Sequence, residues 1–279
     1  MKCFPNARIS IGLNIIGFLE DGDPDIQSVY YPIPLQDELI VLANTASDDP
    51  IVLDFAGIEI PCSPADNLCW FAHHLISTHY RVPRVHALLQ KNIPIGAGLG
   101  GASSDAAFFM RALNDEFKLG LAWGEYHQYA RQLSDDCSFF VGNKPSFAEG
   151  RGDRYESILL DLSGYFILIV YPNIRIRSSD IVDLIHPVAL SRSLENDVLS
   201  LPVAKWKDVI KNDLEDIIFH QHPICKGIKE KMYTGGALYA GLNGMSSCVY
   251  GIFDKVTDLR GAFPGCFVYE APMKISSSG

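Results

Sequence analysis

The chain of 279 residues is 48% hydrophobic and 20% charged, and its formal net charge is −10. This size and composition are typical of a globular protein with one large or two modest domains, and we expect two. The negative charge disfavours a nucleic-acid role, no apolar run reaches the roughly 18 residues of a membrane span, and MKCFPN has no apolar signal-peptide core. We therefore expect a cytoplasmic protein without nucleic-acid or membrane partners.

The first residues of the chain predict short strands. Apolar residues alternate from Ile9 to Ile15, which is strand periodicity, and Arg8 and Ser10 fall on the opposite face. An exposed arginine on a strand face is the ordinary alternative for Arg8. A turn at 20–24 leads to an alternating strand at 28–33.

The next stretch mixes strands with one helix. Short strands are expected around Val41 and Leu53 and at 58–60, followed by an amphipathic helix at 66–80 and a strand at 85–89. A polar residue at or beside the first position of the helix should cap it. Because these elements lack a regular βαβ rhythm, the pattern favours an α+β fold over a doubly wound sheet.

A glycine-rich loop follows, and it is the most informative stretch of the sequence. Four of the six residues from Gly96 to Gly101 are glycines, which admit unusual backbone angles and the close approach of a ligand. Ser103, Ser104 and Asp105 are residue types that cap helices, and a helix body is expected at 106–114. The N–H groups and the positive dipole of such a helix N-terminus suit a phosphate group. A tight turn packed under a helix is the plain alternative.

Three phosphate-loop patterns compete for this segment. The G-x-G-x-x-G spacing from Gly96 to Gly101 fits a dinucleotide turn, but residues 91–94 separate it from the preceding strand. The Walker A spacing from Gly96 to Ser103 has alanine in place of the lysine that grips phosphate. The third pattern, P-x-x-x-G-L-G-x-x-S-S from Pro94 to Ser104, resembles the ATP-binding motif of the GHMP kinases. Within that superfamily, KNIPIGAGLGGASSDAA is most similar to the 4-diphosphocytidyl-2-C-methyl-D-erythritol kinases of non-mevalonate isoprenoid synthesis.

The resemblance implies a two-domain α+β fold of the GHMP type, with domains 1–154 and 155–279 and a nucleotide site in the cleft between them. It also implies ATP as the nucleotide, Mg²⁺ as its metal ion and a small-molecule alcohol as the acceptor. Ser103 or Ser104 would help to bind Mg²⁺. The residues implied to bind ATP are Pro94, Ile95, Gly96, Ala97, Gly98, Leu99, Gly100, Gly101, Ala102, Ser103 and Ser104.

Two further segments resemble the reaction centre of these kinases. Their opening strand, P-A-K-I-N-L, places a lysine at the reaction centre, and alignment lands the lysine on Arg8 and the asparagine on Ser10. An arginine can stabilise a transferring phosphoryl group but cannot share a proton. Their segment G-[AS]-D-C-P-F-F holds an aspartate beside the transferred phosphate, and it maps onto Asp136, with Asp135 as the next residue to test. The implied catalytic residues are Asp136, which would orient the acceptor hydroxyl and take its proton, and Arg8.

The segment that would bind the acceptor departs from the family pattern. The family carries P-D-G-Y-H-E-L, whose tyrosine and histidine are positioned to meet the cytosine, and counting back from Tyr31 puts Asp23 and Pro24 there. Loss of the aromatic face predicts altered acceptor recognition, unless Tyr30 or Tyr31 supplies a ring from nearby. The candidate acceptor-binding residues are Ser10, Asp23, Tyr30, Arg175 and Arg177.

The second half of the chain predicts a buried strand at 165–171 and helices at 199–218 and 223–233. In the extended stretch after the strand, period-2 spacing puts Arg175 and Arg177 on one side. Together they could grip an anionic acceptor, whereas a solvated strand edge protected by charge is the alternative.

A third family motif, G-A-x-x-x-x-M-S-G-S-G-S-x-V-F-G-L-F, resembles GALYAGLNGMSSCVYGIFD. Met245 and Ser246 stand where the family has a serine and a glycine. If this loop closes over the nucleotide, the bulkier pair would narrow the site. The positions that match are Gly244, Ser247, Val249 and Gly251.

Seven scattered cysteines without a C-x-x-C pair, and eight histidines without H-E-x-x-H, indicate reduced thiols and no structural metal. The sequence therefore predicts an ATP-dependent kinase of a small alcohol. A non-catalytic nucleotide-binding protein is the main rival, favoured by Arg8, Ser10 and Met245, and a dinucleotide-dependent oxidoreductase comes third. The sequence leaves the oligomeric state open.

Overall fold

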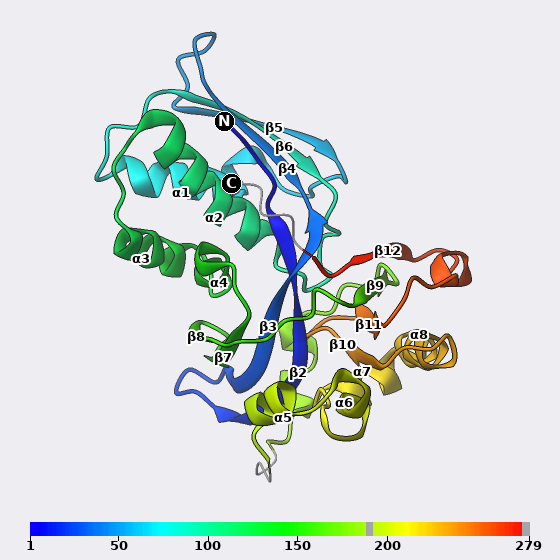
Figure 1. Cartoon of the computed structure of the whole chain (residues 1–279). Coiled ribbons are helices and arrows are strands. Elements are labelled where there is room, and N and C mark those ends of the chain that lie inside the picture. Colours follow the sequence, from blue (N-terminus) through cyan, green and yellow to red (C-terminus); the bar gives the residue numbers. More distant parts are fainter. Residues whose placement is uncertain (188–191, 275–279) are drawn as a thin grey trace. The chain divides into compact units, whose positions relative to one another are not determined.

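A computed structural model describes residues 1–187 and 192–274 of the chain (Figure 1). The chain forms two compact units, each assembled from segments that are distant in the sequence. Unit 1 comprises Met1–Ala7, Leu35–Ile95 and Gly100–Asn143, and unit 2 comprises Arg8–Pro34, Gly96–Leu99 and Lys144–Gly279. The glycine loop therefore belongs to unit 2 up to Leu99, and the chain enters unit 1 at Gly100.

Unit 1 contains a four-stranded sheet and a group of helices. The strand order is β1-β4-β6-β5, in which β4 runs antiparallel to both of its neighbours and β5 runs parallel to β6. The strands are β1 (Lys2–Cys3), β4 (Glu38–Ala43), β5 (Ile51–Gly57) and β6 (Val85–Lys91). The helices are the short 3₁₀ helix η1 (Pro64–Asp66), α1 (Leu68–Ser77), α2 (Gly101–Phe117), α3 (Trp123–Leu133) and α4 (Cys137–Gly142).

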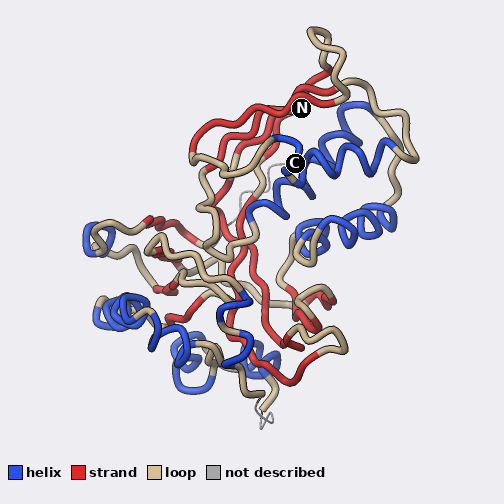
Figure 2. Tube along the Cα trace, turned by 180° about the vertical axis from the view of Figure 1, so that it is seen from behind, coloured by secondary structure: helices blue, strands red, loops and turns tan. Residues whose placement is uncertain are grey.

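The helices of unit 1 lie on one side of its sheet, as the view from behind shows (Figure 2). Helix α2 packs against β4, and α1 packs against both α2 and β5. Alternate side chains of β4 and β6 are buried, among them Leu39, Val41, Ala87 and Leu89. This one-sided burial is the physical origin of the period-2 pattern in these strands.

In its described residues, unit 2 contains two four-stranded sheets and four α-helices. The strand orders are β2-β3-β7-β8 and β10-β11-β9-β12. The strands are β2 (Asn6–Phe18), β3 (Pro24–Gln36), β7 (Ser146–Gly150), β8 (Arg154–Ser157), β9 (Phe166–Tyr171), β10 (Tyr239–Leu242), β11 (Val249–Phe253) and β12 (Phe267–Pro272). The helices are α5 (Leu194–Ser200), α6 (Val203–Val209), α7 (Glu215–Gln221) and α8 (Pro223–Thr234), with 3₁₀ helices η2 (Ser178–Asp180), η3 (Val182–Leu184) and η4 (Leu259–Ala262).

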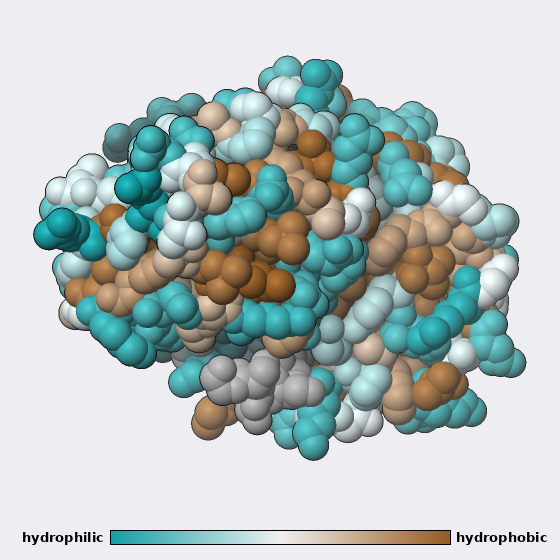
Figure 3. Space-filling model, turned by 90° about the horizontal axis from the view of Figure 1, so that it is seen from above, coloured by the Kyte–Doolittle hydropathy of each residue, from teal (hydrophilic) through white to brown (hydrophobic). Residues whose placement is uncertain are grey.

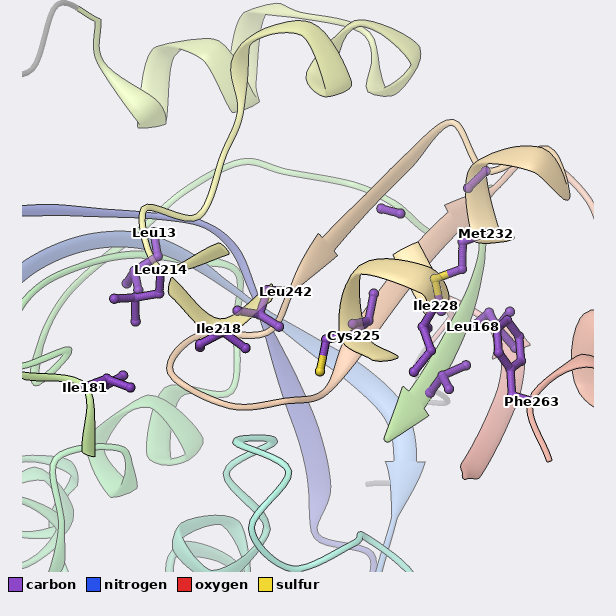
Figure 4. Packing of buried hydrophobic residues seen from close by; sticks show 14 of the residues in the cluster. Leu13, Leu168, Ile181, Leu214, Ile218, Cys225, Ile228, Met232, Leu242 and Phe263 are labelled. Carbon is purple, nitrogen blue, oxygen red and sulfur yellow. The ribbon is translucent and has the colours of Figure 1, made fainter. Parts of the chain in front are cut away.

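The hydrophobic core of unit 2 forms where α7 and α8 pack on the second sheet. Leu168 of β9 and Leu242 of β10 belong to the same buried cluster as Ile218 of α7 and Met232 of α8 (Figure 4). The side chain of Met245 packs against this cluster and is partly buried. Met245 therefore contributes to the core of unit 2, a packing role that its place in the third motif did not suggest.

Several predicted elements are confirmed, and two are wrong. The predicted strands at 9–15 and 28–33 lie within β2 and β3, and the helix at 223–233 is α8. No strand forms at 58–60, because β5 ends at Gly57, whose φ of +80° turns the chain away.

The predicted helix at 199–218 is instead divided among α5, α6 and α7. Between α6 and α7 the chain pairs with β2, since the N–H group of Leu13 donates to Lys211 O (3.0 Å) and the N–H group of Asp213 donates to Leu13 O (2.8 Å). These bonds take the backbone groups that a continuous helix would use. A partner about 200 residues away in the sequence therefore breaks the helix.

The compact units do not follow the predicted domains 1–154 and 155–279. Strands β2 and β3 lie early in the sequence, yet most of their residues belong to unit 2 with the C-terminal half. The units are compact regions, and a compact region need not be a domain that folds independently. The predicted boundary therefore stays a prediction. The α+β class is confirmed by the mixture of helices and mainly antiparallel sheets.

The surface carries single exposed apolar residues, which are normal for a folded protein. Trp123 of α3 (58% exposed) is an example. On the face drawn in Figure 3, hydrophobic residues lie among hydrophilic ones. Across residues 1–187 and 192–274, no helix has both the length and the apolar character that a membrane span requires.

All seven cysteines are free thiols, and the four buried ones are Cys69, Cys137, Cys225 and Cys248. Burial raises the pKa of Cys137 and of Cys225 to about 11. These thiols therefore stay protonated at neutral pH and behave as small apolar side chains.

Candidate active site

The glycine loop has backbone angles that glycine adopts readily and other residues do not. The φ angle is +79° at Gly96, +66° at Gly98 and +73° at Gly100. Gly98 also lacks room for a side chain, because an added Cβ would lie 2.9 Å from both Cβ and Oγ of Ser246. The loop is therefore a close-fitting stretch of backbone at which glycine is required.

Carbonyl groups of this loop accept hydrogen bonds from residues that are distant in the sequence. Ser246 Oγ donates to Ala97 O at 2.9 Å, and Asn243 Nδ2 donates to Gly98 O at 2.9 Å. The backbone N–H group of Arg8 donates to Leu99 O at 2.9 Å. These bonds satisfy the carbonyl groups within unit 2 and fix the conformation of the loop.

We expect the effect of Gly98→Ala to depend on Ser246. The new methyl group requires a φ of +66°, which costs roughly 1–2 kcal/mol for a residue other than glycine, and it also collides with Ser246. In a Ser246→Gly background the collision is removed, so Gly98→Ala should lower the free energy of unfolding by less. Urea unfolding of the four proteins of this double-mutant cycle measures the difference. Equal losses in the two backgrounds would contradict the contact.

Arg8 is a buried cation beside the same loop. It is only 7% exposed, so the alternative of an exposed strand arginine is wrong. Its Nη1 donates to Ser10 Oγ (2.9 Å) and lies 3.4 Å from Gly98 O, and its guanidinium carbon is 3.9 Å from the centre of the Tyr30 ring. Strand β2 is buried on both faces at this point, which alternation alone could not reveal. Arg8, Ser10, Tyr30 and the glycine loop thus form one cluster within unit 2.

Helix α2 begins earlier than the sequence predicts. Its first residue is Gly101, and Gly100 is the N-cap in a left-handed conformation that offers no side-chain cap. Ser103, Ser104 and Asp105 are buried inside the helix, so the prediction that they cap it is wrong. The left-handed glycine turns the chain into the helix before they are reached. The first N–H groups of α2 consequently have no side-chain acceptor at the N-cap, which is the condition for binding an anion.

The two serine hydroxyls of α2 differ in their bonding. Ser103 Oγ forms a hydrogen bond with Ser134 Oγ (2.8 Å), whereas Ser104 Oγ is fully buried and has no hydrogen-bond partner in the described part of the chain. Cys137 Sγ donates to Ser103 O at 3.4 Å. The residues around Cys137 therefore pack against the first turn of α2.

Asp136 directly precedes Cys137 and is the N-cap residue of the short helix α4. It is half-buried, its side chain does not cap that helix, and the neighbouring Asp135 is exposed. Through Cys137 the structure brings Asp136 close to the start of α2 within unit 1. The two elements that the sequence assigned to phosphate binding and to acid–base chemistry are thus adjacent in this unit.

A buried ionic cluster lies beneath the start of α2. Lys91 Nζ bonds the carboxylates of Asp37 and Asp105, the latter at 2.6 Å, and all three side chains are 4% exposed or less. Asp37 Oδ1 also accepts from the N–H groups of Asn92 (2.6 Å) and Ile93 (2.9 Å). Burial acts to lower the pKa of Lys91, but the charges of Asp105 and Asp37 outweigh this effect, so the pKa of Lys91 is raised. The pKa of Asp105 is also raised, and there burial is the main cause. The cluster connects the end of β6 with the residues that lead to the glycine loop and with helix α2.

A cavity of about 510 Å³ lies between α1 and the end of α3, within the size range of small-molecule sites. Apolar side chains form most of its wall. It is lined by Leu68, Phe71, His74 and Leu75 of α1 and by Gln132 and Leu133 of α3. Leu133 directly precedes Ser134, which is bonded to Ser103, so this wall adjoins the first turn of α2.

Comparison with known proteins decides the family. A model of the GHMP kinases N terminal domain matches residues 67–143. Over 277 residues the chain is 39% identical to the 4-diphosphocytidyl-2-C-methyl-D-erythritol kinase of Bacteroides fragilis, with 98% of this chain and 100% of the relative covered. The chain belongs to the 4-diphosphocytidyl-2-C-methyl-D-erythritol kinase family. The kinase of the same name from Parabacteroides distasonis is 36% identical over 275 residues, with 98% of this chain and 100% of the relative covered.

Solved structures agree with this 4-diphosphocytidyl-2-C-methyl-D-erythritol kinase family. A crystal structure of 4-(cytidine 5'-diphospho)-2C-methyl-D-erythritol kinase matches with a TM-score of 0.76 and 25% identity over 90% of each chain. The mevalonate kinase of Methanococcus jannaschii matches with a TM-score of 0.69 at 14% identity over 98% of each chain, which shows a shared fold. The predicted GHMP-type fold and the prediction of an ATP-dependent small-molecule kinase are confirmed.

The turn that the sequence resemblance assigns to the cytosine carries an ionic cluster in the structure. Arg151 Nε donates to the Asp23 carboxylate at 2.8 Å, and Arg151 also pairs with Asp21. Pro24 begins β3 and is buried. Tyr30 is buried in the Arg8 cluster, with 4% of its surface exposed. The positions that hold tyrosine and histidine in the family pattern are therefore a paired carboxylate and a buried proline.

Arg175 and Arg177 were predicted to act together, and the structure gives them different surroundings. Arg177 forms an ion pair with Asp180 at 3.0 Å. Arg175 packs its aliphatic stem on the glycine loop, since an added Cβ at Gly96 would lie 3.4 Å from Arg175 Cγ. Arg175 thus lies beside the candidate phosphate loop, whereas the charge of Arg177 is paired with Asp180.

Sequence reasoning missed the residues that hold the loop in place. Asn243 is separated from Gly98 by 145 residues, and Lys91 is separated from Asp37 by 54. No local pattern marks such pairs. One signal was present at Ser246, because this position departs from the glycine of the third motif and now supplies a hydrogen bond to Ala97.

Proposed function

We propose that this protein transfers the terminal phosphoryl group of ATP to the hydroxyl group of 4-diphosphocytidyl-2-C-methyl-D-erythritol, with a weaker hold on the cytosine than its relatives have. The observation that carries the proposal is the glycine loop, whose carbonyl groups are satisfied within the protein and which leads into a helix without a side-chain cap. That arrangement presents N–H groups to an anion. A nucleotide site in the interdomain cleft, a cytoplasmic location and the absence of nucleic-acid and membrane partners stay predictions.

The triphosphate would bind to the backbone from Gly96 to Ser104, and the adenine base would enter the cavity between α1 and α3. Two features support this placement of the base. The cavity wall at Leu133 adjoins the first turn of α2, and its aliphatic and aromatic side chains can cover the faces of a planar ring. His74 and Gln132 supply polar groups at the rim. The whole nucleotide would thus follow one continuous stretch of the chain.

Mg²⁺ would be held chiefly by the phosphate oxygens, with Ser103 as the protein ligand. In the described part of the chain no cluster of three acidic, histidine or cysteine residues could hold a metal ion, which fits an ion carried by the nucleotide. Ser103 Oγ can donate to Ser134 and keep lone pairs for a hard cation, whereas Ser104 is fully buried. The ion would neutralise charge on the phosphates.

Asp136 and Arg8 would serve the transfer itself. A carboxylate can orient the acceptor hydroxyl and accept its proton as the new bond to phosphorus forms. The Arg8 guanidinium is held by Ser10, Tyr30 and the glycine loop, so it can stabilise the charge of the phosphoryl group without reorganising. Because arginine does not give up its proton, Asp136 is the proton acceptor in this proposal.

A second candidate is a GHMP kinase with a different acceptor, and the Asp23 ion pair favours it. A carboxylate bound to Arg151 cannot stack on a base, and proline has no side-chain donor. Loss of stacking alone is worth about 1–3 kcal/mol, which is roughly a 5- to 150-fold lower kcat/KM.

Steady-state kinetics with ATP and 4-diphosphocytidyl-2-C-methyl-D-erythritol separate the candidates. We expect a kcat/KM below about 10⁴ M⁻¹s⁻¹ and a higher value for the double variant Asp23→Tyr, Pro24→His. Asp21→Asn is the control, since it removes a charge from the same turn without adding a ring. A wild-type value above about 10⁴ M⁻¹s⁻¹ would contradict altered recognition. ATP binding without phosphorylation of any alcohol in a substrate panel would contradict the kinase proposal and favour a non-catalytic protein.

A further inference from the structure

The segment after β9 runs along the glycine loop within unit 2. Ser247 Oγ donates to Ile174 O at 2.5 Å, which fixes the segment at that residue. A Cβ added to Gly96 would meet the hydroxyl group of Tyr171 at 3.2 Å, Arg175 Cγ at 3.4 Å and Arg175 Cδ at 3.7 Å. The stem of Arg175 therefore lies on the first glycine of the loop, and its guanidinium group begins one bond beyond Cδ.

Arg175 is a second basic residue beside this loop, after the buried Arg8. It is exposed, and within residues 1–187 and 192–274 it makes no hydrogen bond or ion pair. Lys91, the basic residue that precedes the loop in the sequence, is already ion-paired with two buried carboxylates. Arg177, two positions further on, is paired with Asp180. An arginine held by its stem against an anion-binding loop, with its charged end unpaired, has the geometry of a phosphate contact.

We propose that Arg175 binds the polyphosphate chain of the nucleotide and does not contact the acceptor. The proposal rests on the proposed function, because it takes the glycine loop to be the triphosphate site. A planar guanidinium group can donate two parallel hydrogen bonds to a phosphate and carries a full positive charge. Backbone N–H groups donate hydrogen bonds but carry no such charge. Arg175 thus adds a full positive charge to that of Arg8 and to the partial charge of the helix N-terminus, and it lies at Gly96, where the loop begins.

Calorimetric titration of the full chain with ATP, in the absence of any acceptor, tests the assignment. We expect Arg175→Gln to weaken ATP binding about ten- to a hundredfold, the usual effect of losing a hydrogen bond between charged groups. Arg175→Lys should recover part of the affinity, because lysine keeps the positive charge but cannot donate the two parallel hydrogen bonds of a guanidinium group. Adenosine, which has no phosphate, should bind both proteins equally. Binding of ATP should also become less sensitive to salt in Arg175→Gln.

Arg177→Gln is the matched control, since it removes the same charge two residues away from a side chain that is already paired. It should leave ATP binding within about twofold of the wild type, as expected for an exposed pair. If the wild type does not bind ATP, the proposed function fails. If the wild type binds ATP and Arg175→Gln binds it equally well, the assignment of Arg175 fails alone. Equal losses in the two variants, or an effect confined to the KM of the acceptor, would also overturn it.

Discussion

Replacing Asp136 with asparagine is expected to lower kcat by about 10²- to 10⁴-fold, the range that acid–base assistance contributes, while ATP affinity changes little. Asparagine keeps the size of the side chain and removes its ability to accept the proton of the acceptor hydroxyl. The backbone at this point packs against the first turn of α2 through Cys137, and that contact does not involve the carboxylate. The substitution should therefore leave the phosphate-binding turn in place.

The measurement is kcat at saturating ATP and acceptor, together with the ATP dissociation constant from calorimetry. Asp135→Asn is the control, because Asp135 carries the same charge one residue earlier and is exposed. Normal turnover by Asp136→Asn would remove Asp136 from the chemistry, and a large loss in Asp135→Asn would move the assignment to that residue. A parallel loss of ATP affinity in Asp136→Asn would make it a binding residue.

The parts of this structure that could be predicted from the sequence are those written in local patterns. Helix α8 was found because Pro223 opens a stretch with helical spacing, and the glycine loop was found because glycines at fixed intervals have few other uses. The same local logic misplaced the start of α2. It assigned capping to serines, whereas the left-handed Gly100 starts the helix earlier without a cap.

The parts that could not be predicted depend on contacts between distant segments. The break between α6 and α7 is caused by pairing with Leu13, and the burial of Arg8 depends on Tyr30 and on the loop carbonyls. Period-2 spacing placed Arg8 opposite the apolar face of β2, but it cannot say whether that second face is covered. For the same reason Arg175 and Arg177 looked equivalent in sequence. Only their neighbours, Gly96 and Asp180, distinguish them.

Replacing Lys91 with methionine is expected to lower the free energy of unfolding by about 3–5 kcal/mol, the range for breaking a buried ion pair on one side. Methionine fills a similar volume, so the loss comes from leaving the carboxylates of Asp37 and Asp105 buried without their cation. Lys2→Met is the matched control, because Lys2 forms an ion pair with Glu38 in the same sheet but is 48% exposed. An exposed pair contributes roughly 0–1 kcal/mol. Urea unfolding measures both losses, and similar values for the two variants would contradict a special role for the buried cluster.

The pH dependence of the Lys91→Met defect tests the electrostatic cause. Burial already raises the pKa of Asp105 in the wild type, and Lys91 opposes that rise, so removing Lys91 should raise the pKa of Asp105 further. A carboxyl group whose pKa is higher in the folded state than in the unfolded state binds protons more readily when folded. Its contribution to stability is therefore gained as the pH falls through the folded pKa. The gap in unfolding free energy between variant and wild type should be widest near neutral pH and should narrow towards about pH 5. A gap that stays constant over this interval would assign the loss to packing around Lys91 and not to its charge.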